Sequence, residues 1–406
     1  MKRAICDKKL CTGCGACSQI CPQRAVMMAA DDEGFLHPYI DEELCNDCEL
    51  CTRTCPINKA IHADKDIVFA STESVISELS VDDNPELQNR AYACYSRDES
   101  VRAQSTSGGV FSQLALYIFG EGGVVFGAGF DKDFRVRHAF TGSEYELDGL
   151  RRSKYVQSDT GNTFREAKEF LNEGKMVLYC GTPCQIAGLK AYLGREYTGL
   201  LTCDLACHGV PSPKVWTYYL DYMKRKYNSP IKAISFRDKA TGWKTSSMRI
   251  DFENGSRYMD LVQKEIFFIG FGKSIFNRQS CYDCWFRLQN TKADITLADF
   301  WGIEQQKEEG YADNHGVSLV ITHTAAGEQA LKHIESKVIC RKKSLEEAVK
   351  YNPRLISSVS EPAGRKYFFK DMSSGLDFDR LRAKYMDNVS MAYKAKKILK
   401  KILGRG

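Results

Sequence analysis

The sequence predicts an α+β and α/β protein, in which a small cysteine-rich N-terminal domain is followed by a larger domain of mixed helices and strands. Three observations lead to this prediction. Eight of the 17 cysteines lie between residues 11 and 55 at a repeated spacing. From about residue 91 onward, apolar runs of strand length alternate with segments of helical periodicity. The length of 406 residues also exceeds that of most single domains.

Composition sets the class of protein. Hydrophobic residues make up 43% and charged residues 27%, as in ordinary globular proteins. So many cysteines in a chain without a signal-peptide pattern indicate thiolate ligands in a reducing compartment rather than a disulfide scaffold. We therefore expect a cytoplasmic protein. No apolar run approaches the roughly 18 residues needed to span a bilayer.

The net charge of +5 is concentrated at the C-terminal end. Residues 380–406 hold nine Lys/Arg and one acid, a local +8, so the remainder sums to −3. We therefore expect no nucleic-acid-binding surface on the body of the protein. The apolar residues of 391–403 fall on one helical face with lysines around it. This pattern fits peripheral contact with an anionic membrane, and it equally fits a solvated helix.

Shifts in composition divide the chain into four parts. The cysteine-rich stretch ends at Cys55-Pro56. Between residues 61 and 89, seven acids stand against one lysine, which is typical of a linker. The predicted parts are a first domain at 1–58, a linker at 59–90, a second domain at 91–345 and a helical basic tail at 346–406.

Two matched cysteine motifs define the chemistry of the first domain. Both have the spacing C-x2-C-x2-C-x3-C-P, and their cysteines are Cys11, Cys14, Cys17 and Cys21, then Cys45, Cys48, Cys51 and Cys55. Three thiolates on one tight loop can hold three corners of a 4Fe–4S cubane, and the other motif supplies the fourth. We therefore predict a two-cluster ferredoxin domain. The predicted ligand sets are Cys11, Cys14, Cys17 and Cys55 for one cluster, and Cys45, Cys48, Cys51 and Cys21 for the other.

The alternative for these motifs is a pair of zinc knuckles, which also use C-x2-C pairs. Zinc sites show no preference for two matched runs of four cysteines followed by proline, so the sequence favours iron–sulfur clusters. Cys6 lies outside the repeated spacing and is interpreted as a buried bystander.

The second domain is predicted to begin with crossover units. Segments of helical character lie at 109–119, 162–173, 183–193 and 213–226, and strand-like runs lie between them at 124–130, 176–180 and 200–206. Strands alternating with helices of this length predict a mainly parallel sheet. Beyond residue 231 the pattern becomes antiparallel, because Asn254-Gly255 separates two short strands. Residues 317–337 then predict a strand followed by a helix.

Eight cysteines of the second part fall outside the ferredoxin motifs. Six form the pairs Cys180/Cys184, Cys203/Cys207 and Cys281/Cys284, and the other two are Cys94 and Cys340. A thiolate at Cys184, where a strand ends and a helix begins, would be stabilised by the helix N-terminus. Three interpretations remain open: buried core cysteines, a zinc site or redox disulfide, and a third iron–sulfur cluster, which we favour. Spacing alone does not select four ligands from the six.

Several motifs of the second domain occur together in one known family. In chain order they are SGGVFSQLALY (107–117), SKYVQSD (153–159), GTPCQIAGL (181–189), CHGVPSP (207–213), ISFRDK (234–239), SCYDC (280–284) and ADITLADFWGI (293–303). With these motifs, residues 90–345 resemble the beta subunit of coenzyme F-420 hydrogenase/dehydrogenase. Several long motifs in one order make the resemblance specific.

The resemblance implies a mixed α/β flavin-binding redox domain, in which FAD passes electrons between a two-electron carrier and iron–sulfur clusters. It also implies that Cys184, Cys207, Cys281 and Cys284 are the ligands of a third 4Fe–4S cluster. By the same resemblance, Cys180 and Cys203 are not ligands of this cluster. Members of the family use different substrates, and no single residue here points to the deazaflavin coenzyme.

Five residues are predicted to contact the flavin: Ser107, Gly108, Gly109, Lys154 and Thr182. The Ser107–Gly109 run and Thr182 each open a helix, whose free N–H groups can hold a phosphate. Lys154 can pair with a phosphate or with the N1–C2=O edge of the flavin. For each residue the alternative is a capping turn or a solvated lysine.

The sequence thus predicts an iron–sulfur flavoprotein oxidoreductase. FAD would exchange a hydride with a deazaflavin-like coenzyme or small substrate, and the clusters would carry single electrons to or from a redox partner protein or ferredoxin. The rival interpretation is a non-catalytic relay subunit that docks to a separate enzyme. Since consecutive centres must lie within tunnelling distance, we expect the two domains to pack together.

Overall fold

The computed structural model describes residues 4–63, 89–306, 311 and 313–387. Most of the predicted linker and the basic end of the predicted tail, residues 388–406, lie outside the described residues. Within the described part, no helix combines the length and the apolar character needed to cross a membrane.

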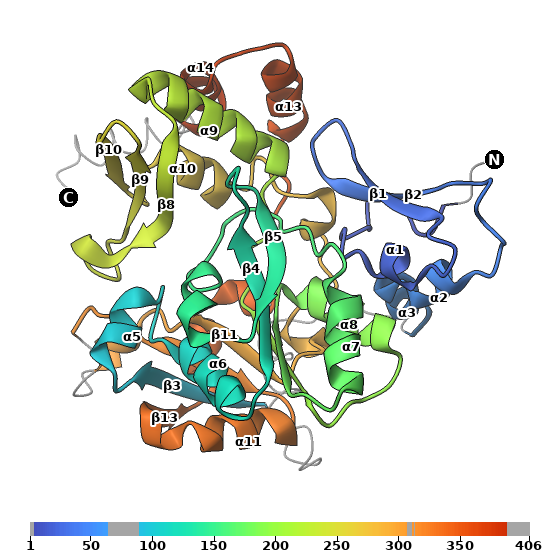
Figure 1. The fold of residues 1–406 in the computed structure, drawn as a ribbon. Coiled ribbons are helices and arrows are strands. Elements are labelled where there is room, and N and C mark those ends of the chain that lie inside the picture. The colour runs from blue at the N-terminus through green and yellow to red at the C-terminus, as the bar shows by residue number, and fades with distance from the viewer. Residues whose placement is uncertain (1–3, 64–88, 307–310, 312, 388–406) are drawn as a thin grey trace.

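The N-terminal cysteine-rich region folds as a small unit at one side of the molecule (Figure 1). Its elements are α1 (Ala16–Ile20), β1 (Val26–Ala30), β2 (Leu36–Ile40), α2 (Leu50–Thr54) and α3 (Pro56–Ala63). β1 and β2 pair antiparallel, and each cysteine motif passes through a tight loop into a short helix, α1 or α2. The tip of the hairpin reaches the larger domain, where the Ser212 hydroxyl donates to the carbonyl of Glu33.

A mixed sheet forms the centre of the larger domain. Among the described residues it has eight strands in the order β13-β3-β12-β11-β7-β6-β4-β5. Their bounds are β3 (Arg90–Ser96), β4 (Val124–Phe130), β5 (Val136–Thr141), β6 (Val177–Cys180), β7 (Leu200–Leu205), β11 (Ile295–Asp299), β12 (Ser318–Thr322) and β13 (Val338–Lys343). Among these strands, the neighbouring pairs β11–β7, β7–β6 and β6–β4 are parallel, and the other four pairs are antiparallel.

The prediction of a mainly parallel sheet was wrong at both edges, where the strands pair antiparallel. At one edge, β5 follows β4 after a turn at residues 131–135. Strands joined by so short a turn can pair only antiparallel, because a parallel pair needs a crossover of a dozen or more residues. At the other edge, β3 lies between β12 and β13, which follow it by more than two hundred residues.

Helices cover both faces of this sheet. They are α5 (Glu99–Gln104), α6 (Val110–Gly120), α7 (Thr163–Asn172), α8 (Pro183–Leu193), α11 (Ala325–His333) and α12 (Leu345–Lys350). Because alternate strand residues point to opposite faces, Leu178 of β6 packs in the core with α6 and α11, whereas Val177 and Tyr179 pack with α7 and α8. The predicted bounds of α6, α7 and α8 agree with the observed ones to within a residue.

A second core lies beside the sheet and is rich in aromatic residues. Its elements are α9 (Pro213–Tyr227), β8 (Ile231–Asp238), β9 (Ser247–Phe252), β10 (Arg257–Leu261), α10 (Ile266–Gly272), α13 (Arg365–Ser373) and α14 (Phe378–Leu381). The predicted hairpin at Asn254-Gly255 joins β9 to β10. Helices α13 and α14 fall in the predicted tail, yet Phe368 and Phe378 are fully buried in this core. The packed body of the protein therefore continues beyond residue 345.

Candidate functional site

The first predicted cysteine set surrounds one cavity. Cys11, Cys14, Cys17 and Cys55 are all buried, and all four line a hollow of about 340 Å³. The loop that carries the first three cysteines turns tightly at Gly13 and Gly15, whose φ angles are 67° and 79°. Glycine adopts this left-handed backbone without the steric cost that a Cβ atom brings. Helix α3 begins directly after the fourth cysteine.

The second predicted set surrounds a second cavity. Cys21, Cys45, Cys48 and Cys51 line a hollow of about 390 Å³. The turning positions here are Asp47 and Glu49, with φ angles of 54° and 59°, so this loop repeats the backbone of the first without its glycines. Cys45, Cys48 and Cys51 are half-buried, whereas the first set is buried. The second cavity therefore lies nearer the surface.

Both cavities fit the demands of a cubane cluster, which needs four thiolates around one hollow. Each hollow is lined by three cysteines of one motif and by the last cysteine of the other. This is the crossed arrangement that the two motifs predict.

Cys6 lies closer to the first cysteine set than its position in the sequence suggested. It lines the first cavity, and its thiol hydrogen-bonds with Cys11 and Cys55. That bond lowers the pKa of Cys11 to about 4 against the opposing effect of burial, with help from His37 and from the charge of Arg278. It also lowers the pKa of Cys55 to about 7. No spacing signal marks this fifth thiol, because it precedes the repeated motif.

The four cysteines of the predicted third set come from three separate segments. Cys184 lies in the first turn of α8, Cys207 follows β7, and Cys281 and Cys284 follow α10. Burial raises the pKa of the Cys184 thiol, and the charges of the other three cysteines raise it further, so the four share one neighbourhood. Burial likewise raises the pKa of Cys207 to about 11 and that of Cys281 to about 12.

The remaining cysteines form two pairs across neighbouring strands. Cys180 of β6 lies opposite Cys203 of β7, and a hydrogen bond with Cys180 is the main cause that raises the pKa of Cys203, followed by burial. Cys94 of β3 lies opposite Cys340 of β13, and a disulfide joins the two. Each of these four cysteines therefore has another cysteine of the same group as its partner.

The third cysteine set is packed against the first through α8. A Cβ atom placed on Gly188 would lie 2.9 Å from the Cβ and 3.0 Å from the Sγ of Cys14. Cys184 precedes this glycine by one helical turn. Cys17, Cys21, Ala187 and Phe286 also share one apolar cluster, with Cys184 and Cys284 at its edge. The expected packing of the two domains is therefore observed (Figure 1).

Two of the predicted flavin contacts, on the Ser107–Gly109 loop, form hydrogen bonds within the protein. The Ser107 hydroxyl donates to the carbonyl of Val317, and the Gly108 N–H donates to the hydroxyl of Ser318. A Cβ atom on Gly108 would lie 2.4 Å from the carbonyl oxygen of Cys94, so only glycine fits against β3 there. Gly109, with a φ of 90°, is the N-cap of α6.

The other two predicted contacts lie on different loops. The Lys154 ammonium donates to the carbonyls of Gly149 and Arg151, and burial lowers its pKa to about 7. This loop adjoins the Ser107 loop, since the Ser153 N–H donates to the hydroxyl of Thr106. Thr182 is the N-cap of α8, and its hydroxyl lies 3.2 Å from the Sγ of Cys184. Thr182 thus lies next to the third cysteine set.

Three motifs of the family resemblance, at residues 107–117, 234–239 and 293–303, meet beside Ser107. The periodicity of the chain could not reveal this contact. The Lys239 ammonium donates to the carbonyl of Ser107, and burial lowers the pKa of this lysine to about 8. Two residues away, Arg237 forms a buried ion pair with Asp299. Asp299 also accepts a 2.7 Å hydrogen bond from the indole of Trp243, and that ring stacks on Trp301 at 4.9 Å.

A third, smaller cavity adjoins Cys207. Its volume is about 240 Å³, and Asp204, Arg287 and Thr296 contribute to its lining. Asp204 is only 1% exposed, and burial raises its pKa to about 7. The Arg287 guanidinium donates to the carbonyl of Cys207, so this cavity shares a wall with the third cysteine set.

Comparisons with known proteins agree with the cysteine motifs. Residues 10–59 match the family model described as a 4Fe-4S dicluster domain. Residues 174–348 match the model for the C terminus of the coenzyme F420 hydrogenase/dehydrogenase beta subunit. A solved chain of the F420-reducing [NiFe] hydrogenase complex from Methanosarcina barkeri aligns at 17% identity and a TM-score of 0.44, covering 75% of this chain and 94% of that one. No curated protein matches the sequence.

Residues 10–59 are thus similar to a 4Fe–4S dicluster domain, and residues 174–348 are similar to the C terminus of the coenzyme F420 hydrogenase/dehydrogenase beta subunit.

Proposed function

We propose that this protein is an iron–sulfur flavoprotein oxidoreductase. Electrons would pass between a two-electron donor or acceptor at FAD and three 4Fe–4S clusters, and from there to or from a redox partner protein or ferredoxin. The two-electron partner would be a deazaflavin-like coenzyme or a small substrate. We assign this activity to the cytoplasm, because reducing conditions keep so many thiols available.

The observation that carries this proposal is the contact between α8 and the first cysteine loop. Gly188 is pressed against Cys14, and Cys184 of the third set lies one turn away on the same helix. Electron transfer between clusters requires such proximity. The order of the path would be third set, first set and second set, because the first set is buried and the second is half-buried near the surface.

The proposed flavin site comprises Ser107, Gly108, Gly109, Lys154 and Thr182. A bound flavin supplies the conversion between hydride chemistry and single electrons, which clusters alone cannot perform. Two lysines support this placement: the Lys239 ammonium donates to the carbonyl of Ser107, and Lys154 follows Ser153, whose N–H donates to the hydroxyl of Thr106. Burial lowers the pKa of both ammonium groups.

A specific observation favours the relay alternative. The hydroxyl of Ser107, the N–H of Gly108 and the ammonium of Lys154 all have partners within the protein. A non-catalytic subunit would need no free group there. The two functions therefore differ in whether these contacts give way to a bound flavin.

Anaerobic reduction of the purified holoprotein distinguishes the two functions. Reduced deazaflavin coenzyme, NADH and NADPH are each mixed with the protein, and the flavin and cluster absorbances are followed over time. An oxidoreductase loses its flavin absorbance first with at least one hydride donor, and cluster reduction follows. Protein that binds no flavin and is reduced only by dithionite or by a reduced ferredoxin is a relay, and this result would refute the enzymatic proposal.

A further inference from the structure

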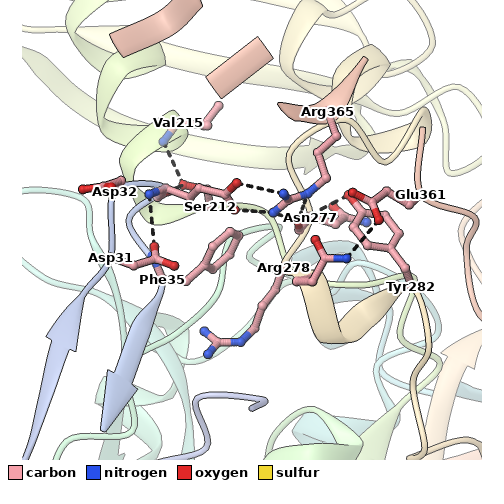
Figure 2. A network of polar contacts seen from close by, with 12 residues as sticks. Asp31, Asp32, Phe35, Ser212, Val215, Asn277, Arg278, Tyr282, Glu361 and Arg365 are labelled. Carbon is pink, nitrogen blue, oxygen red and sulfur yellow. Dashed lines mark hydrogen bonds and ion pairs between the residues drawn. The ribbon is translucent and has the colours of Figure 1, made fainter. Parts of the chain in front are cut away.

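Arg278 belongs to the larger domain, and its guanidinium lies at the interface, where it donates to groups of both domains. Its side chain is 1% exposed. Nε donates to the carbonyl of Cys11 at 2.7 Å, and Nη2 donates to the carbonyl of Leu36 at 2.9 Å. Figure 2 shows the side chain running below Phe35 toward the N-terminal hairpin, and the guanidinium carbon lies 5.4 Å from the centre of that ring.

The hydrogen-bond partners of this buried cation are almost all neutral. Nη1 donates to the side-chain carbonyl of Gln157 at 3.1 Å, and Nη2 also contacts a ring nitrogen of His37. Among the described residues, no carboxylate pairs with Arg278. The one group here that carries negative charge as a cluster ligand is the sulfur of Cys11, which lies 3.6 Å from Nη2. A buried charge is costly without a counter-charge, and a thiolate-bound cluster would supply one.

A second buried arginine in the same interface shows the contrast. Arg365 is 4% exposed and also spans the two domains. Its guanidinium forms a two-pronged ion pair with Glu33 at the hairpin tip. It also donates to the carbonyl of Asn277 (Figure 2). Arg365 thus has its own carboxylate, and none of these bonds reaches a cysteine. Arg278 and Arg365 hold the same interface, but only Arg278 directs its charge at the first cavity.

The backbone of Arg278 also belongs to the scaffold of the third cysteine set. Its N–H donates to the carbonyl of Val210, which follows Cys207. Its carbonyl accepts a hydrogen bond from the N–H of Cys281. One residue therefore joins the loops of the third set to the first set.

We propose that Arg278 is a positioning residue that makes the cluster of the first cysteine set easier to reduce and holds it against the third set. This inference rests on the iron–sulfur part of the proposed function and is independent of the flavin. Reduction adds one electron and no proton, so the negative charge at the first cavity grows by one. A buried cation and an N–H···S bond stabilise the reduced form more than the oxidised one, which raises the reduction potential.

The test is an anaerobic redox titration of the full-length holoprotein, monitored by electron paramagnetic resonance. Arg278→Gln removes the charge, Arg278→Lys retains it, and Glu33→Gln disturbs the same interface without touching a cysteine contact. We expect one cluster of Arg278→Gln to become at least tenfold harder to reduce, a fall of about 59 mV in its midpoint potential. Arg278→Lys should stay close to the wild type, and Glu33→Gln should leave every potential unchanged.

Unshifted potentials in Arg278→Gln would overturn the proposal, as would an equal shift in Glu33→Gln. If Arg278→Gln fails to fold, wild-type protein labelled with 15N-arginine provides the second measurement. A nitrogen coupling to one reduced cluster, absent from Arg278→Lys, supports the contact, and its absence in the wild type refutes it. Iron and sulfide analysis of the same samples distinguishes failure of the Arg278 proposal from failure of the proposed function. Wild-type protein without cluster iron would contradict the proposed function itself.

Discussion

At the scale of single residues, Asp204 is a carboxyl group whose protonation is tied to folding. Burial raises its pKa to about 7, although hydrogen bonds from the hydroxyls of Thr296 and Thr291 oppose the shift. An unfolded chain releases this proton near pH 4, so the folded state binds more protons between about pH 4 and about pH 7. The stability contributed by the protonated form is therefore complete below pH 4 and lost as the pH rises to 7.

We predict that this single group makes the protein less stable by about 1.4 kcal/mol for each pH unit in that window. Asp204→Asn should remove this slope, because the amide stays neutral. The measurement is the apparent thermal midpoint of the holoprotein between about pH 5.5 and about pH 7.5. Asp294→Asn, at a neighbouring buried carboxyl bonded to Thr202, is the control that should keep the slope. A wild-type slope preserved in Asp204→Asn would contradict the assignment.

The spacing of the two motifs agrees with the cysteines that line each cavity in the structure, and the role of these cysteines as cluster ligands stays a prediction. The two motifs predicted which cysteines share a cavity, because cubane coordination demands that crossing. Spacing gave no sign of Cys6, which precedes the motif. It also gave no sign that Asp47 and Glu49 adopt the left-handed backbone of Gly13 and Gly15. This left-handed backbone goes against the ordinary preference of a glutamate.

At the scale of elements, α8 depends on a glycine at its contact with the first cysteine loop. Gly188→Ala would place a methyl group within 3.0 Å of both side-chain atoms of Cys14. A glycine-to-alanine change inside a helix usually stabilises by about 0.5–1 kcal/mol. Here we predict a loss of about 1–3 kcal/mol, because the two domains must shift apart.

The experiment compares thermal unfolding and iron content in Gly188→Ala and Gly120→Ala. Gly120 ends α6 and has nothing within 4 Å of its would-be Cβ atom, so alanine there should be neutral or slightly stabilising. Gly188→Ala should unfold at a lower temperature and retain less iron. If both variants match the wild type, α8 is not pressed against Cys14.

Elements with strong local signals were predicted well. The bounds of α8 follow from a proline in its first turn and from Gly194 after its end, where φ is 69°. The sequence analysis did not identify the strands β3, β5 and β13 near the sheet edges, and β3 finds its partners only after more than two hundred residues. Local patterns contain no information on such distant pairing. The placement of α13 and α14 was missed for the same reason.

At the scale of the whole molecule, the sequence predicted that the two domains pack together but not which residues form their interface. A chain of clusters requires close packing, which the structure has. The residues that provide it, such as Arg278 with Cys11 and Arg365 with Glu33, are hundreds of positions apart in the sequence. The third cysteine set was selected only by family resemblance. In the structure, the four chosen cysteines gather in one neighbourhood, and Cys180 pairs with Cys203.

We propose above all that three cysteine sets hold three clusters that serve one flavin. The most direct test is iron, sulfide and flavin content per chain after anaerobic purification, measured on the wild type, Cys184→Ser and Cys180→Ser. We predict about twelve irons and one FAD for the wild type and for Cys180→Ser, and about eight irons for Cys184→Ser. About eight irons and no flavin in the wild type would contradict the proposal, and so would an iron content that Cys184→Ser leaves unchanged.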